Sequence, residues 1–369
     1  MTALLHPSAY IPSDATTIIR NTSRGAELMG CLHPEQLAII YAQNWFNLFV
    51  PKALGGLELS LPEALTIEEG LAYADGSTGW TVTLCSGANW FAGFLNHEIA
   101  SVIFSNKKVC LAGSGQPGGI AKVIPGGYEI TGRWKYATGA PHATAFTANC
   151  VIEKDGIVLQ NEDGSPVVHS FIFLKDEVFI YNDWHTTGMI ATASHSFEVT
   201  NLQVPANRRF TIEAATAVLN NPIYQYPFLQ FAEATLTVNV SGMAMRFADL
   251  CEILFAGRTG HKNFTSAMLD ALQQKLDTAK QQLHTARQRF YTAVHQSWQA
   301  CLTGNAAGSL LFEHVSATSH ALAQACLQAV DALYPFCGLA AADSRTEINR
   351  VWRNIHTASQ HSLLTPLLS

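Results

Sequence analysis

The sequence predicts an α+β protein with an N-terminal helical domain, a middle antiparallel β domain and a C-terminal helical bundle. Apolar residues recur every three or four positions up to about residue 106, alternate with polar residues from about 107, and return to the helical period after about 211. We therefore expect three domains, at residues 1–106, 107–210 and 211–369. Three is a usual number for a chain of 369 residues.

Helix start signals mark the N-terminal region. Ser13 and Asp14 are candidate N-caps, and Pro34 and Pro62 each precede apolar residues at helical spacing, as prolines of a first helical turn do. The segment 51–57, PKALGGL, is rich in turn residues and should separate two helices.

Runs of β-branched and aromatic residues fill the middle region, separated by Gly, Pro, Asn and Asp. This composition is typical of short strands joined by turns, and it predicts a compact antiparallel β domain. The runs are 109–112, 128–136, 144–152, 168–174, 178–181 and 196–199.

The C-terminal region is dominated by one long helical pattern. Between Lys262 and Leu302 there is no Gly or Pro, and apolar residues recur at spacings of three and four. We expect this helix to form a bundle with the segments 228–254 and 310–333.

Charged residues are scarce. They make up 14% of the chain, against about 25% in typical soluble domains. Because 22 Lys and Arg stand against 28 Asp and Glu without a basic cluster, a nucleic-acid protein is excluded. The most apolar stretch, 325–342, is interrupted by polar residues and Pro335, so we expect a cytoplasmic protein and no membrane span. The low charge predicts surface buried between subunits or beneath a large ligand.

The common motifs of nucleotide, disulfide and metal sites do not identify a functional site in this sequence. Gly113-Ser-Gly-Gln-Pro-Gly118 matches a dinucleotide-binding glycine pattern but opens no helix, so we interpret it as a glycine-rich loop against a flat ligand. The eight cysteines are scattered singly. His356 and His361 are five residues apart and would point to different sides of a helix, so we expect no metal site.

Five segments in order along the chain resemble the acyl-CoA dehydrogenase superfamily. The strand ITGRWKYATGAPH at 130–142 resembles the family pattern G-x-W-x-[FY]-x-[ST]-G. The resemblance is closer to the oxygenase components of two-component flavin-dependent monooxygenases. The other four segments are 49–57, 74–80, 183–189 with Val204-Pro205, and 350–361.

This resemblance implies helices, a β domain and a four-helix bundle, in the order that the periodicity predicts. It also implies a FAD or FMN between the β domain and the bundle, supplied in reduced form by a separate flavin reductase. The neighbouring subunit of a homodimer or homotetramer would complete the flavin site. The implied reaction is hydroxylation of a small aromatic or heteroaromatic substrate.

The same resemblance assigns candidate site residues. His361, with His356 as the alternative, matches the histidine that moves a proton in these oxygenases, a task that suits an imidazole. Thr138 matches the hydroxyl residue that faces flavin N5. The remaining assignments are Ala112, Gly113 and Ser114 at the flavin, Arg258 at the flavin phosphate of the adjacent subunit, and Ser86, Asn89, Trp90 and His142 around the substrate.

Two alternatives remain open. An acyl-CoA dehydrogenase would need a carboxylate base, which the segment after Arg350 lacks and which Glu233 could provide. The second alternative is a family member that binds a flavin or another ligand without catalysing a reaction. Two segments depart from the family pattern: 188–194 reads GMIATAS and lacks an arginine and two glycines, and Asn354 replaces an aspartate.

Overall fold

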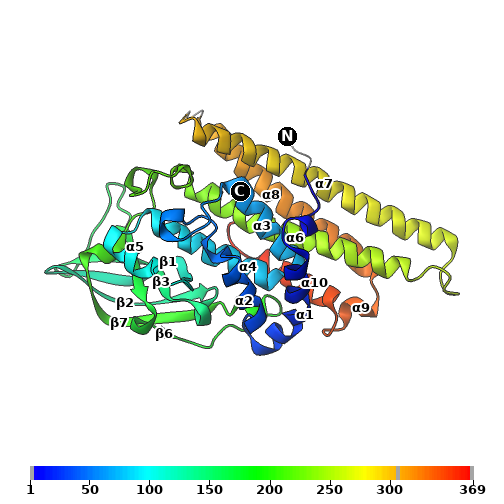
Figure 1. The fold of residues 1–369 in the computed structure, drawn as a ribbon, viewed down its shortest axis with the longest axis horizontal. Helices are drawn as coiled ribbons and strands as arrows, with labels where there is room; N and C mark the ends of the chain where they lie inside the picture. The colour runs from blue at the N-terminus through cyan, green and yellow to red at the C-terminus, as the bar shows by residue number, and fades with distance from the viewer. Residues whose placement is uncertain (1–3, 305–307, 366–369) are drawn as a thin grey trace.

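Two helical regions from opposite ends of the sequence lie together, and one β-sheet stands beside them (Figure 1). The computed structural model describes residues 4–304 and 308–365. The order of helices, strands and helices confirms the predicted fold class.

The N-terminal helices start at local capping signals. Ser60 accepts a hydrogen bond from the Glu63 backbone N–H while the Glu63 carboxylate accepts from that of Ser60, and Pro34 and Pro62 occupy first turns as predicted. The first helix differs, because Pro12 is its N-cap and Ser13 and Asp14 lie inside it. The helices are α1 Ser13–Met29, α2 Pro34–Ala42, α3 Leu61–Ala74, α4 Gly76–Asn89 and α5 His97–Phe104.

The middle region forms a mixed sheet in the order β6-β7-β2-β1-β3-β5-β8, with β4 beside β3. Its strands are β1 Leu111–Ile124, β2 Gly127–Ala137, β3 Ala145–Lys154, β4 Ile157–Val158, β5 Val168–Leu174, β6 Phe179–Ile180, β7 His195–Pro205 and β8 Arg209–Phe210. The prediction of an antiparallel domain is wrong at one pair, since β1 and β3 are parallel. After β2 the chain crosses through the short helix Ala140–His142 and enters the sheet on the other side of β1.

The glycine-rich segment 113–118 is also not the loop that its composition predicts. It lies inside β1, where the pairing with β3 shifts register between Ser114 and Gly119. Glycine is required at positions 118 and 119 because the Trp134 ring packs directly on the backbone of these two residues. A Cβ would lie 2.8 Å from this ring at Gly118 and 2.4 Å from it at Gly119.

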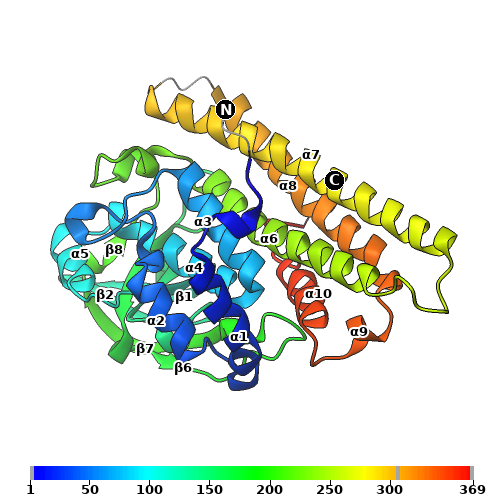
Figure 2. The same ribbon diagram turned by 45° about the vertical axis from the view of Figure 1, so that its right-hand side comes forward.

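Three long helices form most of the C-terminal region, and they run side by side in Figure 2. They are α6 Phe228–Ala256, α7 Ser266–Leu302 and α8 Gly308–Leu333, followed by the short α9 Leu339–Ala342 and α10 Glu347–Ala358. The predicted long helix and its two partners are thereby confirmed.

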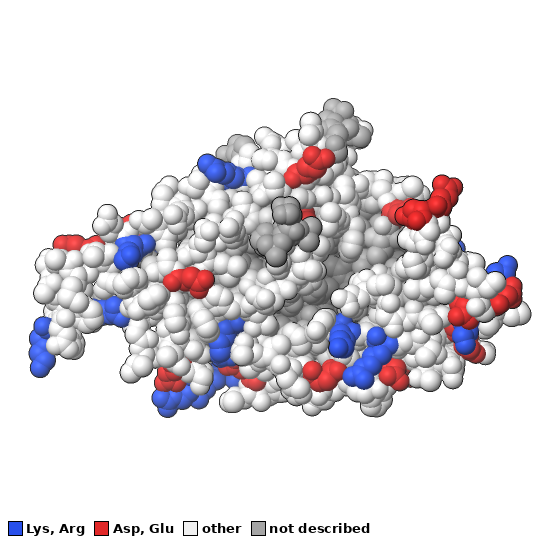
Figure 3. Space-filling model, turned by 180° about the vertical axis from the view of Figure 1, so that it is seen from behind, with Lys and Arg blue, Asp and Glu red and all other residues white. Residues whose placement is uncertain are grey.

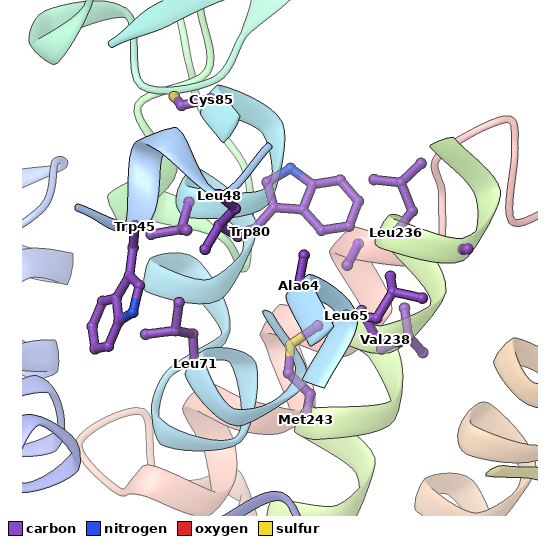
Figure 4. Close-up of a cluster of buried hydrophobic side chains, with 14 of the residues drawn as sticks. Trp45, Leu48, Ala64, Leu65, Leu71, Trp80, Cys85, Leu236, Val238 and Met243 are labelled. Carbon is purple, nitrogen blue, oxygen red and sulfur yellow. The ribbon is translucent and has the colours of Figure 1, made fainter. Parts of the chain in front are cut away.

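The N-terminal and C-terminal helices share one hydrophobic core. Trp80, Leu65 and Leu71 of α3 and α4 lie in the same buried cluster as Leu236 and Met243 of α6 (Figure 4). The sheet has a separate core around Trp134, Phe146 and Phe197. This shared core therefore holds α4 and α6 together beside the sheet, although the two helices are far apart in sequence.

A buried ion pair also joins the two helical regions. Arg287 of α7 donates from Nε and Nη2 to the Glu69 carboxylate of α3, at 2.7 and 2.8 Å. Tyr291 and Ser241 donate to the same carboxylate, so both charges are satisfied although their side chains are 2% and 0% exposed.

The surface carries few charges, as the composition predicts. Figure 3 shows one face on which Lys, Arg, Asp and Glu stand in small separate groups among uncharged side chains. In the part of the chain that the structure describes, no helix combines the length and apolar character that crossing a membrane requires.

Candidate active site

A cavity of about 290 Å³ lies where α4, the sheet and the start of α6 meet. The C-terminal segment after α10 contributes His361 and Leu363 to its lining. Five predicted site residues line this cavity: Ala112, Gly113, Ser114, Thr138 and His361. The structure therefore brings together residues that are up to 249 positions apart, from Ala112 to His361.

One wall of the cavity is aromatic. Phe91, Phe210, Phe228 and Phe231 line it, and Trp90 lies behind, stacked on Phe228 at 5.5 Å and on Phe231 at 4.9 Å between ring centroids. Such a wall suits a flat, apolar ring.

The opposite wall carries main chain and small polar side chains. Gly113 is held against β3, since a Cβ there would lie 2.1 Å from Thr147 Oγ1, whereas Gly115 faces open space. Gly113 and Gly115 thus present main chain without a side chain at the cavity, and Ala112 and Ser114 add only small side chains there. A flat ring system such as an isoalloxazine fits this arrangement of main chain and uncharged hydroxyl groups.

Thr138 belongs to a chain of three buried hydroxyl groups. Thr192 donates to the Met189 carbonyl at 2.8 Å, so it accepts from Ser194 at 2.7 Å. Ser194 in turn accepts from Thr138 at 2.8 Å. Because its only proton is used in this chain, the Thr138 oxygen faces a ligand as an acceptor.

His361 lies next to Trp80, with 6.0 Å between ring centroids. Its Nδ1 accepts a hydrogen bond from the Leu363 backbone N–H at 3.3 Å. Burial lowers the pKa of the imidazole, because the charged form loses solvation. At neutral pH His361 is therefore an uncharged ring with its proton on Nε2.

Three residues that were predicted to contact the substrate do not line the cavity. Their side chains are buried and hydrogen-bonded to other protein groups. Ser86 donates to the Glu68 carboxyl at 3.2 Å, and the Trp90 indole donates to the Ile223 carbonyl at 3.2 Å. The Asn89 amide donates to Asn47 and accepts from the Leu111 backbone. These contacts hold α4 against its neighbours.

The other two predicted histidines also lie outside the cavity lining. His142 is half-buried after β2, and burial lowers its pKa to about 4. His356 lies on α10, with Nε2 3.1 Å from Asp331 and its ring against Trp352.

Arg258 lies just beyond the other end of α6. It donates to the Phe336 carbonyl at 2.6 Å and packs over Phe255 and Phe264. Leu236 is 22 residues earlier on α6, so Arg258 lies roughly 30 Å from the cavity along the helix axis. Within one subunit it cannot contact a ligand there.

Glu233 points away from the cavity, although its neighbours Ala232 and Thr235 line it. Its carboxylate accepts a short hydrogen bond from Ser316 and lies 3.4 Å from His320 Nε2, both on α8. Only 6% of the side chain is exposed. The carboxylate is therefore committed to the contact between α6 and α8.

A buried carboxyl that the sequence analysis missed lies behind the cavity. Glu68 on α3 is fully buried, and burial raises its pKa well above the usual range. Its neighbour Thr83, which lines the cavity, accepts from Asn239 at 2.8 Å. Glu68 Oε2 and Asn239 Oδ1 have no partner among the described residues. Burial therefore favours the protonated, uncharged form of the Glu68 carboxyl.

Several lining residues also escaped the sequence analysis. Phe228 and Phe231 stand three apart at the start of a helix, so their shared face could have been predicted. Nothing in the local sequence marks Thr147, Asn149 or Ser170, because strand pairing across the sheet brings them to the cavity. Among the described residues, no three His, Cys, Asp or Glu side chains converge in a group that could hold a metal.

Comparison with known proteins confirms the resemblance to the acyl-CoA dehydrogenase superfamily. Residues 234–366 match the family model "Acyl-CoA dehydrogenase, C-terminal domain". The solved structure of XiaF from a Streptomyces species in complex with FADH2 and glycerol superimposes with a TM-score of 0.87 over 97% of this chain and 91% of that chain, at 20% identity. The family model thus covers the C-terminal part of the chain, and nearly the whole chain has the fold of XiaF.

The curated relatives are hydroxylases and monooxygenases. The pigment production hydroxylase of a Rhodococcus species is 31% identical over 54% of this chain and 52% of its own length. The indole-3-acetate monooxygenase of Pseudomonas putida is 28% identical over 59% and 54%. These two matches thus span about half of each relative. The flavin-dependent monooxygenase oxygenase subunit HsaA of Mycobacterium tuberculosis is 24% identical over 94% and 89%.

Proposed function

We propose that this protein is the oxygenase component of a two-component flavin-dependent monooxygenase that hydroxylates a small aromatic or heteroaromatic substrate. The observation that carries the proposal is the cavity, which joins His361, Thr138 and the small residues 112–115 to a wall of four phenylalanines. The relatives named as monooxygenases support the same chemistry.

The flavin would lie against the backbone of 112–115 and Thr138. A reduced flavin, when bound, supplies the electrons with which O2 is activated. Reduction adds an N–H group at N5, and Thr138 presents an oxygen that can only accept. The hydroxyl chain therefore favours the reduced form of the cofactor. We propose FAD or FMN, and the FADH2 bound to XiaF favours FAD.

His361 would hold and move the proton of the substrate. Its Nε2–H can donate to the oxygen of a phenol in the resting state, and because burial keeps the ring uncharged near neutral pH, the ring can act as a base once its proton shifts to Nδ1. The apolar wall excludes water, which would otherwise compete with the substrate.

An acyl-CoA dehydrogenase is the second candidate, and one observation opposes it. Its base would have to reach a substrate in the cavity, but Glu233 is hydrogen-bonded to Ser316 on α8. Glu68 lies beside Thr83 of the cavity lining, but burial raises its pKa and so favours the protonated carboxyl, which is not a base. A member of the family that binds a ligand without turnover is the third candidate.

The partners belong to the same proposal. We propose a separate flavin reductase as electron source, a cytoplasmic location, and a homodimer or homotetramer in which Arg258 approaches the flavin phosphate of a neighbouring subunit. Exposed apolar side chains near Arg258 support a subunit contact: Ile253 is 65% and Leu339 is 87% exposed.

Anaerobic flavin binding tests the proposal. The protein should bind reduced FAD or FMN more tightly than the oxidised form, as measured by equilibrium dialysis in sealed cells. Butyryl-CoA and octanoyl-CoA should leave the absorbance of bound oxidised FAD unchanged. Bleaching of FAD by either thioester would instead identify a dehydrogenase, and tight flavin binding without any oxygen-dependent chemistry would favour the third candidate.

A further inference from the structure

The described residues that line the cavity include no Lys, Arg, Asp or Glu. The polar groups among them are hydroxyls, one amide, backbone groups and the imidazole of His361. That imidazole is uncharged near pH 7, because burial lowers its pKa.

The two nearby carboxyl groups, those of Glu68 and Glu233, do not add a negative charge to the cavity lining. Glu233 is turned toward α8, and Glu68 lies behind Thr83, where burial favours the uncharged form of its carboxyl. A ligand inside the cavity therefore meets hydrogen-bonding dipoles and aromatic rings but no formal charge of either sign.

Such a lining discriminates strongly by charge. An ion that enters loses its hydration, and this loss is recovered only where an opposite charge or several aligned donors replace the water. In this cavity the donors are few, and Thr138 presents an acceptor. A carboxylate would face that acceptor and the apolar wall without a cation to pair with.

From this lining we infer that the cavity selects uncharged aromatic substrates, such as a phenol or an indole whose substituents are neutral, and rejects those that carry a carboxylate. The ring would lie against Phe228 and Phe231, and the oxygen of its hydroxyl group or neutral substituent would lie near the Nε2–H of His361. This inference rests on the proposed function, which defines the cavity as the substrate site.

A matched pair of probes tests the charge selection. Indole-3-acetamide and indole-3-acetate have nearly the same size and shape, but only the acetate is charged at pH 7. Binding of each to the protein loaded with reduced FAD is measured anaerobically by isothermal titration calorimetry. The acetamide should bind at least about tenfold more tightly than the acetate.

A variant supplies the missing cation. Ile212 is half-buried at the lining, so Ile212→Arg can place a guanidinium at the cavity with little core disruption. It should raise the affinity for indole-3-acetate at least about tenfold, and Ile212→Gln, which adds polarity but no charge, should not. Thermal unfolding identifies a misfolded variant, and the wild-type comparison does not depend on either variant.

Equal or tighter binding of the acetate by the wild type would overturn the inference, as would failure of both indole-3-acetamide and phenol to bind. These outcomes differ from failure of the proposed function, because the oxygen reaction of the bound reduced flavin needs no substrate. If that reaction proceeds and the acetate still binds well, only the charge selection is wrong.

Discussion

The backbone N–H of Leu363 donates a hydrogen bond to His361 Nδ1 at 3.3 Å. This contact fixes the neutral imidazole as the Nε2–H tautomer, so the remaining ring nitrogen is a donor in the resting state. No hydrogen bond among the described residues engages Nε2. The ring can therefore hold the oxygen of a ligand before it takes part in proton transfer.

Substituting His361 should separate ligand binding from proton transfer. His361→Gln keeps an N–H donor but does not titrate near neutral pH, so a phenol probe should bind within about threefold of wild type while hydroxylation falls about 100-fold or more. His361→Ala should lose both binding and turnover. Both variants should keep the wild-type affinity for flavin, and turnover by the Gln variant at the wild-type rate would exclude His361 as the proton carrier.

Ser194→Ala should weaken the preference for reduced flavin. Without Ser194 the Thr138 hydroxyl loses its acceptor and is free to donate, as oxidised flavin N5 requires. The ratio of the dissociation constants of oxidised and reduced FAD should fall about threefold to tenfold, since one neutral hydrogen bond changes direction. Ser165→Ala, on an exposed turn, is the control. An unchanged ratio in Ser194→Ala would show that the hydroxyl chain does not select the redox state.

The buried Glu68 carboxyl should make stability depend on pH. Its pKa in the folded state is raised, so the folded protein retains a proton that the unfolded chain releases above about pH 4.5. The contribution to stability is full below that pH and declines as pH rises, at up to about 1.4 kcal/mol per pH unit. In urea unfolding between pH 5 and 8, Glu68→Gln should lack this decline, because its amide does not titrate. Parallel pH profiles for the two proteins would contradict the assignment.

Two glycines of β1 offer a matched test of the cavity wall. Gly113→Ala should destabilise the protein by about 1–3 kcal/mol and weaken flavin binding, because its Cβ would collide with Thr147. Gly115→Ala should leave the unfolding free energy nearly unchanged, because its Cβ would meet no atom within 4 Å. Thermal unfolding and flavin titration measure both effects. Equal stabilities would mean that β3 moves to accommodate the Gly113 side chain.

Local periodicity predicts the helices well because each is specified by its own residues. The apolar stripe of α7 and the prolines at the starts of α2 and α3 are signals of this kind. The parallel pairing of β1 with β3 could not be predicted in this way, since it depends on the path of the chain between the strands. The buried pair of Glu69 and Arg287 is likewise hidden, because its members are 218 residues apart.

The candidate site was predictable only where a motif marks a residue. Thr138 and His361 lie in segments that resemble the superfamily, and both line the cavity. Ser86, Asn89 and Trp90 stand out in the sequence as polar and aromatic residues on a helix, but their partners are other buried groups. The sequence shows that a polar side chain on a buried helix needs a hydrogen-bond partner. It does not show whether that partner is a ligand or another part of the protein.

The reaction of the bound reduced flavin with oxygen tests whether this protein is a flavin-dependent monooxygenase. The protein is mixed anaerobically with reduced FAD, exposed to O2 in a stopped-flow cell, and followed by absorbance without any substrate. We expect a transient, spectrally distinct from both reduced and oxidised flavin, that persists longer than in free solution. Oxidation at the rate of free flavin without a transient, together with reduction of bound FAD by an acyl-CoA thioester, would contradict it.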